Sequence, residues 1–292
     1  MYSAAMRANI LLLLTAGIWG TTFSAQKFAM QYMEPLTFNA IRFALGSLVL
    51  VPLISRMDKK QAGNSQNTRH LVFSGCLLGL LMFTGSYLQQ LGICLTSAGK
   101  AGFLTGMYVV QVPLFGIFMK QKYGLGTWIG TFLAICGTYF LSVTQDFSIN
   151  KGDLLVLAGS AFWALHVICI GFFSPGLRTV DAVKMSCVQF MACSVFSLIA
   201  AIFVEHITAS GIWASIWAIF YAGFFSVGIA FTLQVVAQRD AKPATAAILL
   251  CTEGIFATIA GWLFLDETMG ARTILGCLLI FCGMVCSQLK WR

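Results

Sequence analysis

The sequence is organised as ten apolar runs, and the last five runs resemble the first five. A helix needs about 20 mostly apolar residues to span a bilayer. The predicted spans are 9–30, 36–54, 71–92, 98–119, 125–144, 153–173, 182–204, 212–236, 243–265 and 270–289. Because five is odd, two halves that fold alike must lie in the membrane in opposite orientations. The sequence therefore predicts an all-α integral membrane protein of ten helices, built as two inverted five-helix repeats.

Composition agrees with a membrane protein. Hydrophobic residues make up 59% of the chain and charged residues only 10%, against about 25% charged in soluble domains. The first run is longer than the apolar core of a cleavable signal, and no A-x-A-like site ends it, so it is expected to remain as a helix. The connections are mostly short, which leaves little chain for a soluble catalytic domain.

Basic residues predict the orientation of the chain. The net charge is +8, and Lys and Arg are enriched in cytoplasmic loops. With the N-terminus inside, most basic residues face the cytoplasm, and Lys100, Lys151 and Arg272 lie at the opposite ends of their spans. We therefore expect a multi-pass protein of a bacterial inner membrane with both termini cytoplasmic. The bilayer is its expected partner, and nucleic acid is not.

An internal repeat supports the division into halves. A shift of 146 residues aligns the fourth and fifth spans with the ninth and tenth without a gap. Identical glycine pairs are 124 with 270, 130 with 276, and 137 with 283. A tryptophan also recurs near the start of each half, as Trp19 and Trp163. The predicted repeats are residues 1–148 and 149–292.

Three stretches carry a resemblance to a known family. They are residues 18–53, beginning IWGTTFSAQ, residues 95–119, beginning LTSAGKAGF, and residues 243–284, beginning PATAAILLCTEG. Together they resemble EamA-type members of the drug/metabolite transporter superfamily. The resemblance implies a ten-helix fold with two inverted EamA repeats, and a central cavity lined by the first, third, fourth, sixth, eighth and ninth helices. In many members it also implies export of small metabolites, amino acids or drugs.

The ninth span carries an acid that the resemblance makes notable. The family pattern is Glu-Pro-Val-Phe, whereas this chain has Glu253-Gly254-Ile255-Phe256, so the acid is kept and the proline is not. A charge at the bilayer centre costs about 2.5–3.5 kcal/mol on insertion scales. Glu253 is therefore expected to carry a proton or face the substrate, or else to bond helix ends or a nearby Lys as a structural acid.

The fourth span carries a polar stripe and a proline. Lys100, Tyr108 and Gln111 share a helix face with Leu104 and could line a polar cavity. Alternatively, Lys100 extends to the outer interface and Tyr108 belongs to the aromatic belt. Pro113 should bend or break this helix, because it removes a backbone hydrogen bond.

Other polar side chains add candidates. His166 follows Trp163 by three residues on one face and could exchange protons, or simply bond a neighbour. The amides of Gln90, which shares a face with Tyr87, and of Gln234 suit a polar or zwitterionic solute, but also serve as contacts between helices.

Lys27 and Arg42 lie near the outer ends of the first two spans, with Glu34 between them. Both basic side chains are expected to reach the interface or to pair with Glu34.

These observations favour a secondary transporter of a small organic metabolite, an amino acid or drug-like solute, working by alternating access. ATP hydrolysis is not expected, since no G-x-x-x-x-G-K-[ST] loop occurs. No catalytic residue, metal or cofactor is predicted. Protons, exchange and the solute gradient are all left open as energy sources. The alternatives are an intramembrane lipid-modifying enzyme and a membrane channel or sensor. The predicted substrate residues are Trp19, Tyr87, Gln90, Tyr108, Gln111, Trp163, His166 and Gln234, with Glu253 and Lys100 as coupling or charged residues.

Overall fold

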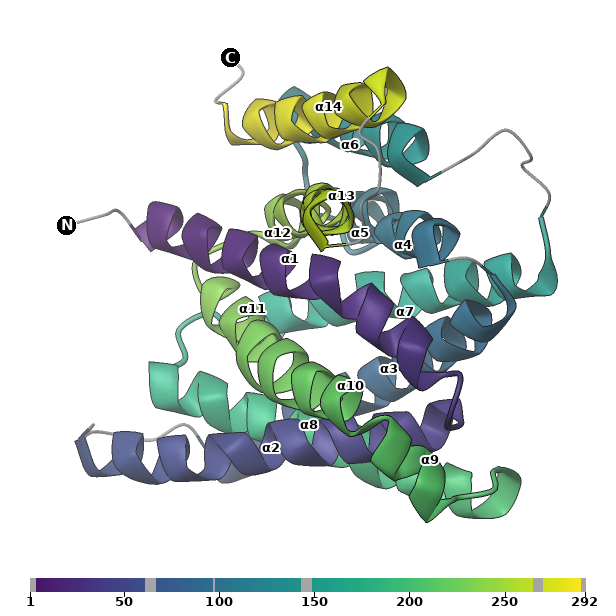
Figure 1. The fold of residues 1–292 in the computed structure, drawn as a ribbon. Coiled ribbons are helices and arrows are strands. Elements are labelled where there is room, and N and C mark those ends of the chain that lie inside the picture. The colour runs from purple at the N-terminus through teal and green to yellow at the C-terminus, as the bar shows by residue number, and fades with distance from the viewer. Residues whose placement is uncertain (1–3, 61–66, 97, 143–148, 265–269, 290–292) are drawn as a thin grey trace.

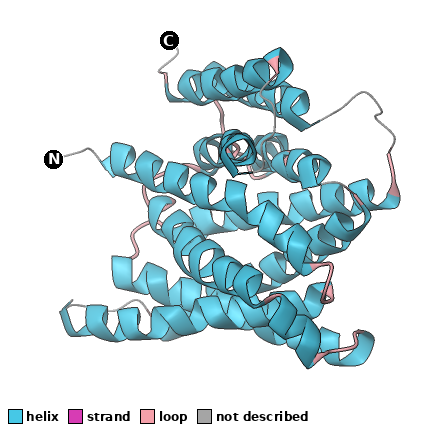
Figure 2. Ribbon diagram, in the orientation of Figure 1, coloured by secondary structure: helices cyan, strands magenta, loops and turns pink. Residues whose placement is uncertain are grey.

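A computed structural model of the chain describes residues 4–60, 67–96, 98–142, 149–264 and 270–289. Within these ranges the secondary structure is helical and contains no strand (Figure 2). The elements are α1 (Ala4–Ala29), α2 (Pro35–Lys60), α3 (Thr68–Leu95), α4 (Ala98–Gly106), α5 (Tyr108–Phe118), α6 (Leu125–Ser142), α7 (Lys151–Phe173), α8 (Thr179–Val204), α9 (Ala209–Ala214), α10 (Ile216–Phe220), the π-helix η1 (Tyr221–Phe231), α11 (Thr232–Ala237), α12 (Pro243–Leu250), α13 (Glu253–Phe264) and α14 (Ala271–Gln288).

The predicted all-helical membrane fold is confirmed, and the number of crossings is not settled by helix length. Among the described residues, seven helical segments are long and apolar enough to cross a bilayer. Three further apolar helices are shorter, at Leu125–Phe140, Pro243–Phe256 and Ala271–Ser287. They fall on the fifth, ninth and tenth predicted spans. The protein is therefore a multi-pass membrane protein, and ten crossings stay a prediction.

The helices form layers (Figure 1). At one edge α6 packs on α14, and at the opposite edge α2 packs on α8. Between these pairs, α1 contacts η1, α11, α12 and α13, and α7 contacts α3, α4 and α5. The start of α1 and the end of α14 lie on the same side of the molecule, at the left of Figure 1.

Glycines allow the closest of these contacts. A Cβ added to Gly92 of α3 would lie 2.7 Å from the carbonyl oxygen of Gly152 on α7. About two turns away along the same helices, a Cβ on Gly159 of α7 would lie 3.1 Å from the carbonyl oxygen of Gly85 of α3. Small residues let helix backbones approach in a bilayer, where dispersion contacts and hydrogen bonds replace the hydrophobic driving force. This close packing positions the α3 and α7 side chains that reach the centre of the molecule.

Two helices are interrupted at the centre of the fold. The first break is at Met107, between α4 and α5, and the second is at Cys251–Thr252, between α12 and α13. Pro113 lies inside α5 and does not break it, so a break at this proline is wrong: the helix is interrupted six residues earlier, at Met107. Broken helices are tolerated at membrane depth where the backbone is buried in protein or lines a cavity. The breaks make Tyr108 and Glu253 the first residues of α5 and α13.

The eighth predicted span is also irregular. Its middle, Tyr221–Phe231, is a π-helix, η1, which packs against α1 and α2. π-Helical turns are rare and occur frequently at functional sites. This segment carries Ser226 and Phe231, and both residues face the central pocket described below.

A lysine ties α1 to the end of α3. The Lys27 ammonium donates to the carbonyl oxygens of Ile93, at 2.5 Å, and Thr96, at 3.0 Å. The Thr96 hydroxyl donates in turn to Asp153 Oδ1 at the start of α7, at 2.6 Å. The expected pairing of Lys27 with Glu34 is therefore wrong, because the C-terminal carbonyls of a helix attract the cation instead. Glu34 accepts a hydrogen bond from the backbone N–H of His206, at 3.0 Å.

Candidate functional site

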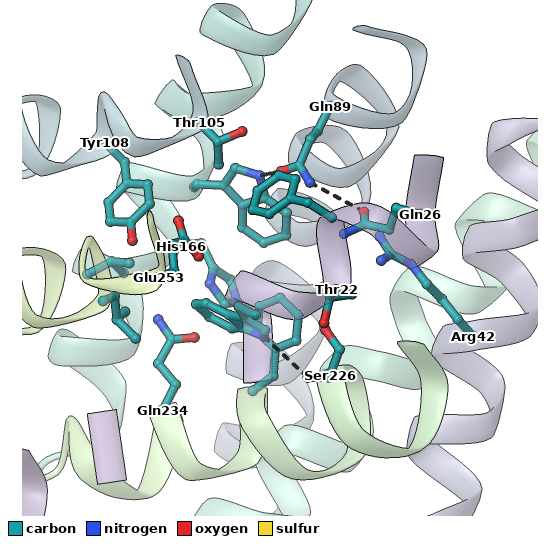
Figure 3. A pocket seen from close by; sticks show the side chains of 16 residues that line it. Thr22, Gln26, Arg42, Gln89, Thr105, Tyr108, His166, Ser226, Gln234 and Glu253 are labelled. Carbon is teal, nitrogen blue, oxygen red and sulfur yellow. Dashed lines mark hydrogen bonds between the residues drawn. The ribbon is translucent and has the colours of Figure 1, made fainter. Parts of the chain in front are cut away.

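A pocket lies at the centre of the molecule, where the two helix breaks meet α1, α3, α7 and the η1–α11 helix. The space between atoms there amounts to about 570 Å³, part of it open to the outside, and the cavity volume proper is about 60 Å³. Side chains from all of these elements line it, and Arg42 of α2 adds to them (Figure 3). The helices that the family resemblance implies around a cavity are thus the ones found here, with α2 in addition.

Three aromatic rings form the apolar wall of the pocket. The ring centroid of Phe231 lies 4.5 Å from that of Trp19 and 5.7 Å from that of Trp163, and the Trp163 and Phe231 rings are stacked. Aromatic pairs at such separations add about 0.5–1.5 kcal/mol beyond their burial. The wall therefore joins one tryptophan from each half of the chain through a single phenylalanine.

One end of the pocket is polar and holds several buried atoms that lack a protein partner. Within the described part of the chain, these atoms are Thr105 Oγ1, His166 Nδ1 and Gln234 Oε1. Glu253 Oε1 lies beside them, in a carboxyl group that interacts with the Tyr108 hydroxyl. The Tyr108 hydroxyl points toward the Glu253 carboxyl group (Figure 3). A buried polar atom without a partner is costly, so native proteins normally satisfy it with protein, ordered water or ligand. This cluster can therefore accept and donate hydrogen bonds to a polar solute.

A hydrogen-bonded chain of side chains connects three helices along the pocket. The Trp163 indole N–H donates to Gln89 Oε1 at 2.8 Å, and Gln89 Nε2 donates to Gln26 Oε1 at 3.4 Å. The Trp19 indole N–H donates to the carbonyl oxygen of Ser226 at 3.4 Å. These bonds hold both indole rings in place, so the aromatic wall is preorganised.

Arg42 lies at the end of the pocket away from Tyr108 and Glu253 (Figure 3). Its Nε donates to Asn39 Oδ1 at 3.0 Å, and its guanidinium carbon lies 4.8 Å from the centroid of the Phe43 ring. Only 3% of the residue is exposed. The expectation that Arg42 reaches the interface or pairs with Glu34 is therefore wrong, because its side chain lies inside the protein, bonded to Asn39 and packed against the Phe38 and Phe43 rings.

The structure brings six of the ten predicted site residues together in the pocket: Trp19, Tyr108, Trp163, His166, Gln234 and Glu253. His166 also reaches α8, since its Nε2 lies 3.0 Å from Gln189 Oε1.

Three of the other four predicted residues, Tyr87, Gln90 and Gln111, do not line the pocket. Tyr87 stacks on Phe83, Gln111 Oε1 accepts from the Ser160 hydroxyl at 3.1 Å, and Gln90 is buried with both amide atoms unpaired in the described part of the chain. The side chain of Lys100 lies outside the described residues.

Sequence reasoning missed several residues of the pocket. Thr22 and Gln26 follow Trp19 by three and seven positions, a spacing that places all three on one helix face. That pattern could have identified them. Phe231 had no comparable signal, since it is one of 25 phenylalanines in an apolar chain.

Comparisons with known proteins agree with this architecture. The profile of the EamA-like transporter family matches residues 6–143 and again residues 150–288. An uncharacterized transporter of Archaeoglobus fulgidus is 30% identical over 97% of this chain and 86% of its own length. The uncharacterized inner membrane transporter YedA of Escherichia coli strain K12 is 23% identical over 86% of this chain and 81% of its own length.

A solved crystal structure shares the fold, with a TM-score of 0.78, coverage of 97% of this chain and 98% of that chain, and 17% identity. Two matches to one family profile cover nearly the whole sequence, and the names of the relatives point to transport rather than catalysis. The chain belongs to the EamA-like transporter family.

Proposed function

We propose that this protein is a secondary transporter that carries a small organic metabolite, an amino acid or drug-like solute, through the central pocket by alternating access. The observation that carries the proposal is the pocket itself. It combines an aromatic wall with a cluster of buried polar atoms that have no protein partner in the described chain, beside two helix breaks. Ligand sites in transporters typically lie where discontinuous helices meet near mid-membrane.

The proposal includes ten crossings arranged as two inverted repeats, residues 1–148 and 149–292. Several contacts support a pseudo-twofold axis. The two family matches are of similar length, α6 packs on α14, and α2 packs on α8. A shift of 146 residues also carries the break at Met107 to Glu253, next to the second break. In this arrangement both termini are cytoplasmic and the protein lies in a bacterial inner membrane.

The proposed transport step follows from the helix breaks that border the pocket and from its position between the two halves. The two halves rock around the solute, and the helix breaks let α4 and α12 tilt separately from α5 and α13. Glu253 is proposed to carry a coupled proton, because it lines the pocket and its carboxyl group lies beside the Tyr108 hydroxyl. Export from the cytoplasm is the direction that the family resemblance implies.

Reconstituted protein tests the transport proposal. A thermal-shift screen of the purified protein against a metabolite panel identifies binders, since a ligand of the folded state raises its stability. Counterflow of a binder into proteoliposomes then measures transport. Comparing uptake into inside-out and right-side-out vesicles measures the direction of transport. Thr22→Trp should fill the pocket and abolish counterflow, because Thr22 lines it and is 1% exposed. The matched control is Leu14→Trp on the same helix, where the side chain is 53% exposed. Equal activity of both variants would contradict a central route.

Site-directed labelling tests the proposed topology separately. Asn67 and Asn150 are exposed and are the N-cap residues directly before α3 and α7. In a cysteine-reduced background, a membrane-impermeant maleimide should label Asn67→Cys only from the cytoplasmic side and Asn150→Cys only from the opposite side. Labelling of both positions from one side would refute the inverted arrangement.

A further inference from the structure

The pocket contains a buried positive charge that no protein anion neutralises in the described part of the chain. Arg42 lines the pocket at 3% exposure, and the one hydrogen bond that it makes to the described residues uses Nε. Neither terminal nitrogen, Nη1 or Nη2, has an acceptor among the described residues. A buried charge is normally paired, because removing it from water without a partner is expensive.

The surroundings of Arg42 hold the guanidinium in one orientation. Asn39 Oδ1 accepts from Nε, and the Asn39 amide donates to the Ser86 hydroxyl on α3 at 3.3 Å. The rings of Phe38 and Phe43 lie 5.1 and 4.8 Å from the guanidinium carbon. Neutral partners of this kind fix the position of the side chain and leave its charge in place. The terminal nitrogens therefore remain as a preformed, two-pronged donor for an incoming group, which is the geometry that suits a carboxylate.

We propose that Arg42 binds a carboxylate of the transported solute, so that the substrate class is organic acids, including zwitterions, with an apolar or aromatic body. The inference rests on the proposed transport function and makes it more specific. The apolar body would lie against Trp19, Trp163 and Phe231. The end of the solute opposite its carboxylate would reach Tyr108 and Glu253. The buried charge is thus compensated when the solute is bound.

The charge of the pocket favours a carboxylate over a phosphate. Arg42 is the one permanently cationic side chain among the described lining residues, and Glu253 is an acid in the same lining. A dianionic phosphate group would have only one of its two negative charges compensated by the single guanidinium, and an uncompensated charge is costly in a low-dielectric site. A single negative charge matches the single guanidinium.

A matched set of probes tests this assignment on the wild-type protein. The probes are 3-phenylpropionate, its neutral amide 3-phenylpropionamide, and 2-phenylethyl phosphate, which share a phenyl body and differ in the head group. Isothermal titration of the detergent-purified protein gives each Kd. We expect the acid to bind about tenfold or more tighter than the amide, as a charge-assisted contact implies, and tighter than the phosphate. Equal binding of the acid and amide, no binding of either, or a preference for the phosphate would overturn the proposal.

Two variants test whether Arg42 causes the preference for the acid over the amide. Arg42→Gln should bring the acid and amide within about twofold of one another, and Arg42→Lys should keep part of the preference, because it retains the charge but not the fork. An undiminished acid preference in Arg42→Gln would move the site elsewhere. If a variant fails to fold, the wild-type comparison of acid with amide still decides the proposal. Counterflow by the wild type separates the two proposals, since transport without acid preference removes only the role of Arg42, whereas acid binding without any transport removes the carrier function.

Discussion

Gly130 of α6 and Gly283 of α14 make a reciprocal contact. A Cβ added to Gly130 would lie 2.7 Å from the Gly283 carbonyl oxygen, and a Cβ added to Gly283 would lie 2.7 Å from the Gly130 carbonyl oxygen. Further along, a Cβ on Gly137 would lie 2.6 Å from the carbonyl oxygen of Gly276. Because a shift of 146 carries 130 to 276 and 137 to 283, the two contacts exchange under that shift.

This contact predicts that Gly130→Ala destabilises the protein. The new methyl group would meet backbone, which cannot rotate away, so the helices must separate, at a cost of about 1–3 kcal/mol. Alanine is the better helix former by about 1 kcal/mol, so a net loss shows that the steric contact dominates. Differential scanning fluorimetry should give a lower Tm for this variant. Gly124→Ala is the control, because nothing lies within 4 Å of its added Cβ. Identical melting of the two variants would argue against the α6–α14 contact.

Glu205 predicts a second stability effect at the opposite edge of the fold. Its carboxylate follows α8 and accepts from the backbone N–H groups of Leu36 and Thr37, both at 2.7 Å, and from the Thr37 hydroxyl at 2.8 Å. These donors belong to the first turn of α2, where a carboxylate is favourable. Glu205→Ala should therefore cost about 1–2 kcal/mol, and Glu205→Gln less, as measured by thermal unfolding. Glu34→Ala, which removes the acceptor of one backbone N–H, should have a smaller effect than Glu205→Ala; the reverse order would contradict the capping role.

The bond between Trp163 and Gln89 predicts a coupling energy. Gln89→Leu leaves the indole N–H without its acceptor, and an unsatisfied buried donor costs about 1–3 kcal/mol. Trp163→Phe removes the donor together with the larger ring. The double variant should therefore lose less stability than the sum of the single variants, by about 0.5 kcal/mol or more. A cycle of Gln89→Leu with Trp217→Phe, whose ring is 80% exposed, should be additive. Additivity in the first cycle would show that the bond contributes nothing.

Proton coupling through Glu253 is tested by its amide. Glu253→Gln keeps the shape of the side chain and removes the proton that it would carry. In proteoliposomes, uptake driven by an imposed pH gradient should be lost, while solute exchange should continue in part. Glu34→Gln is the matched control, because Glu34 lies outside the central pocket and bonds His206. Undiminished pH-driven uptake by Glu253→Gln would assign the coupling to another group or to none.

The helical segments could be predicted well, because the hydropathy of each segment is read directly from its own residues. Every predicted span falls on helical structure in the described residues, and helices at the breaks still read as continuous apolar runs. The positions of the breaks were not predictable in the same way. Pro113 was the obvious candidate, but the helix ends at Gly106, and the second break forms at Cys251–Thr252 without a proline. Tertiary contacts around the pocket decide those positions.

The site was harder to predict, because a helix face changes by about 100° with each residue. Gln89 and Gln90 have the same chemistry, yet Gln89 reaches the pocket and Gln90 does not. Arg42 was expected at the interface, although its side chain lies on the face of α2 that packs inside the protein, and packing of this kind is not visible in the sequence. Glu253, His166 and the two tryptophans could be selected from the sequence because charged and large aromatic groups are conspicuous within apolar runs.

The ties made by Lys27 set a condition on how the pocket can open beside α1 and α3. Lys27 follows the pocket residue Gln26, and its ammonium donates to the carbonyl oxygens of Ile93 and Thr96 at the end of α3. The Thr96 hydroxyl in turn links the end of α3 to Asp153 of α7. Any separation of these helices strips the cation of both acceptors within a nonpolar surrounding. Water must then hydrate the Lys27 ammonium as the helices separate. The entry of water between α1 and α3, and not the sliding of apolar surfaces, would therefore limit the rate of this movement.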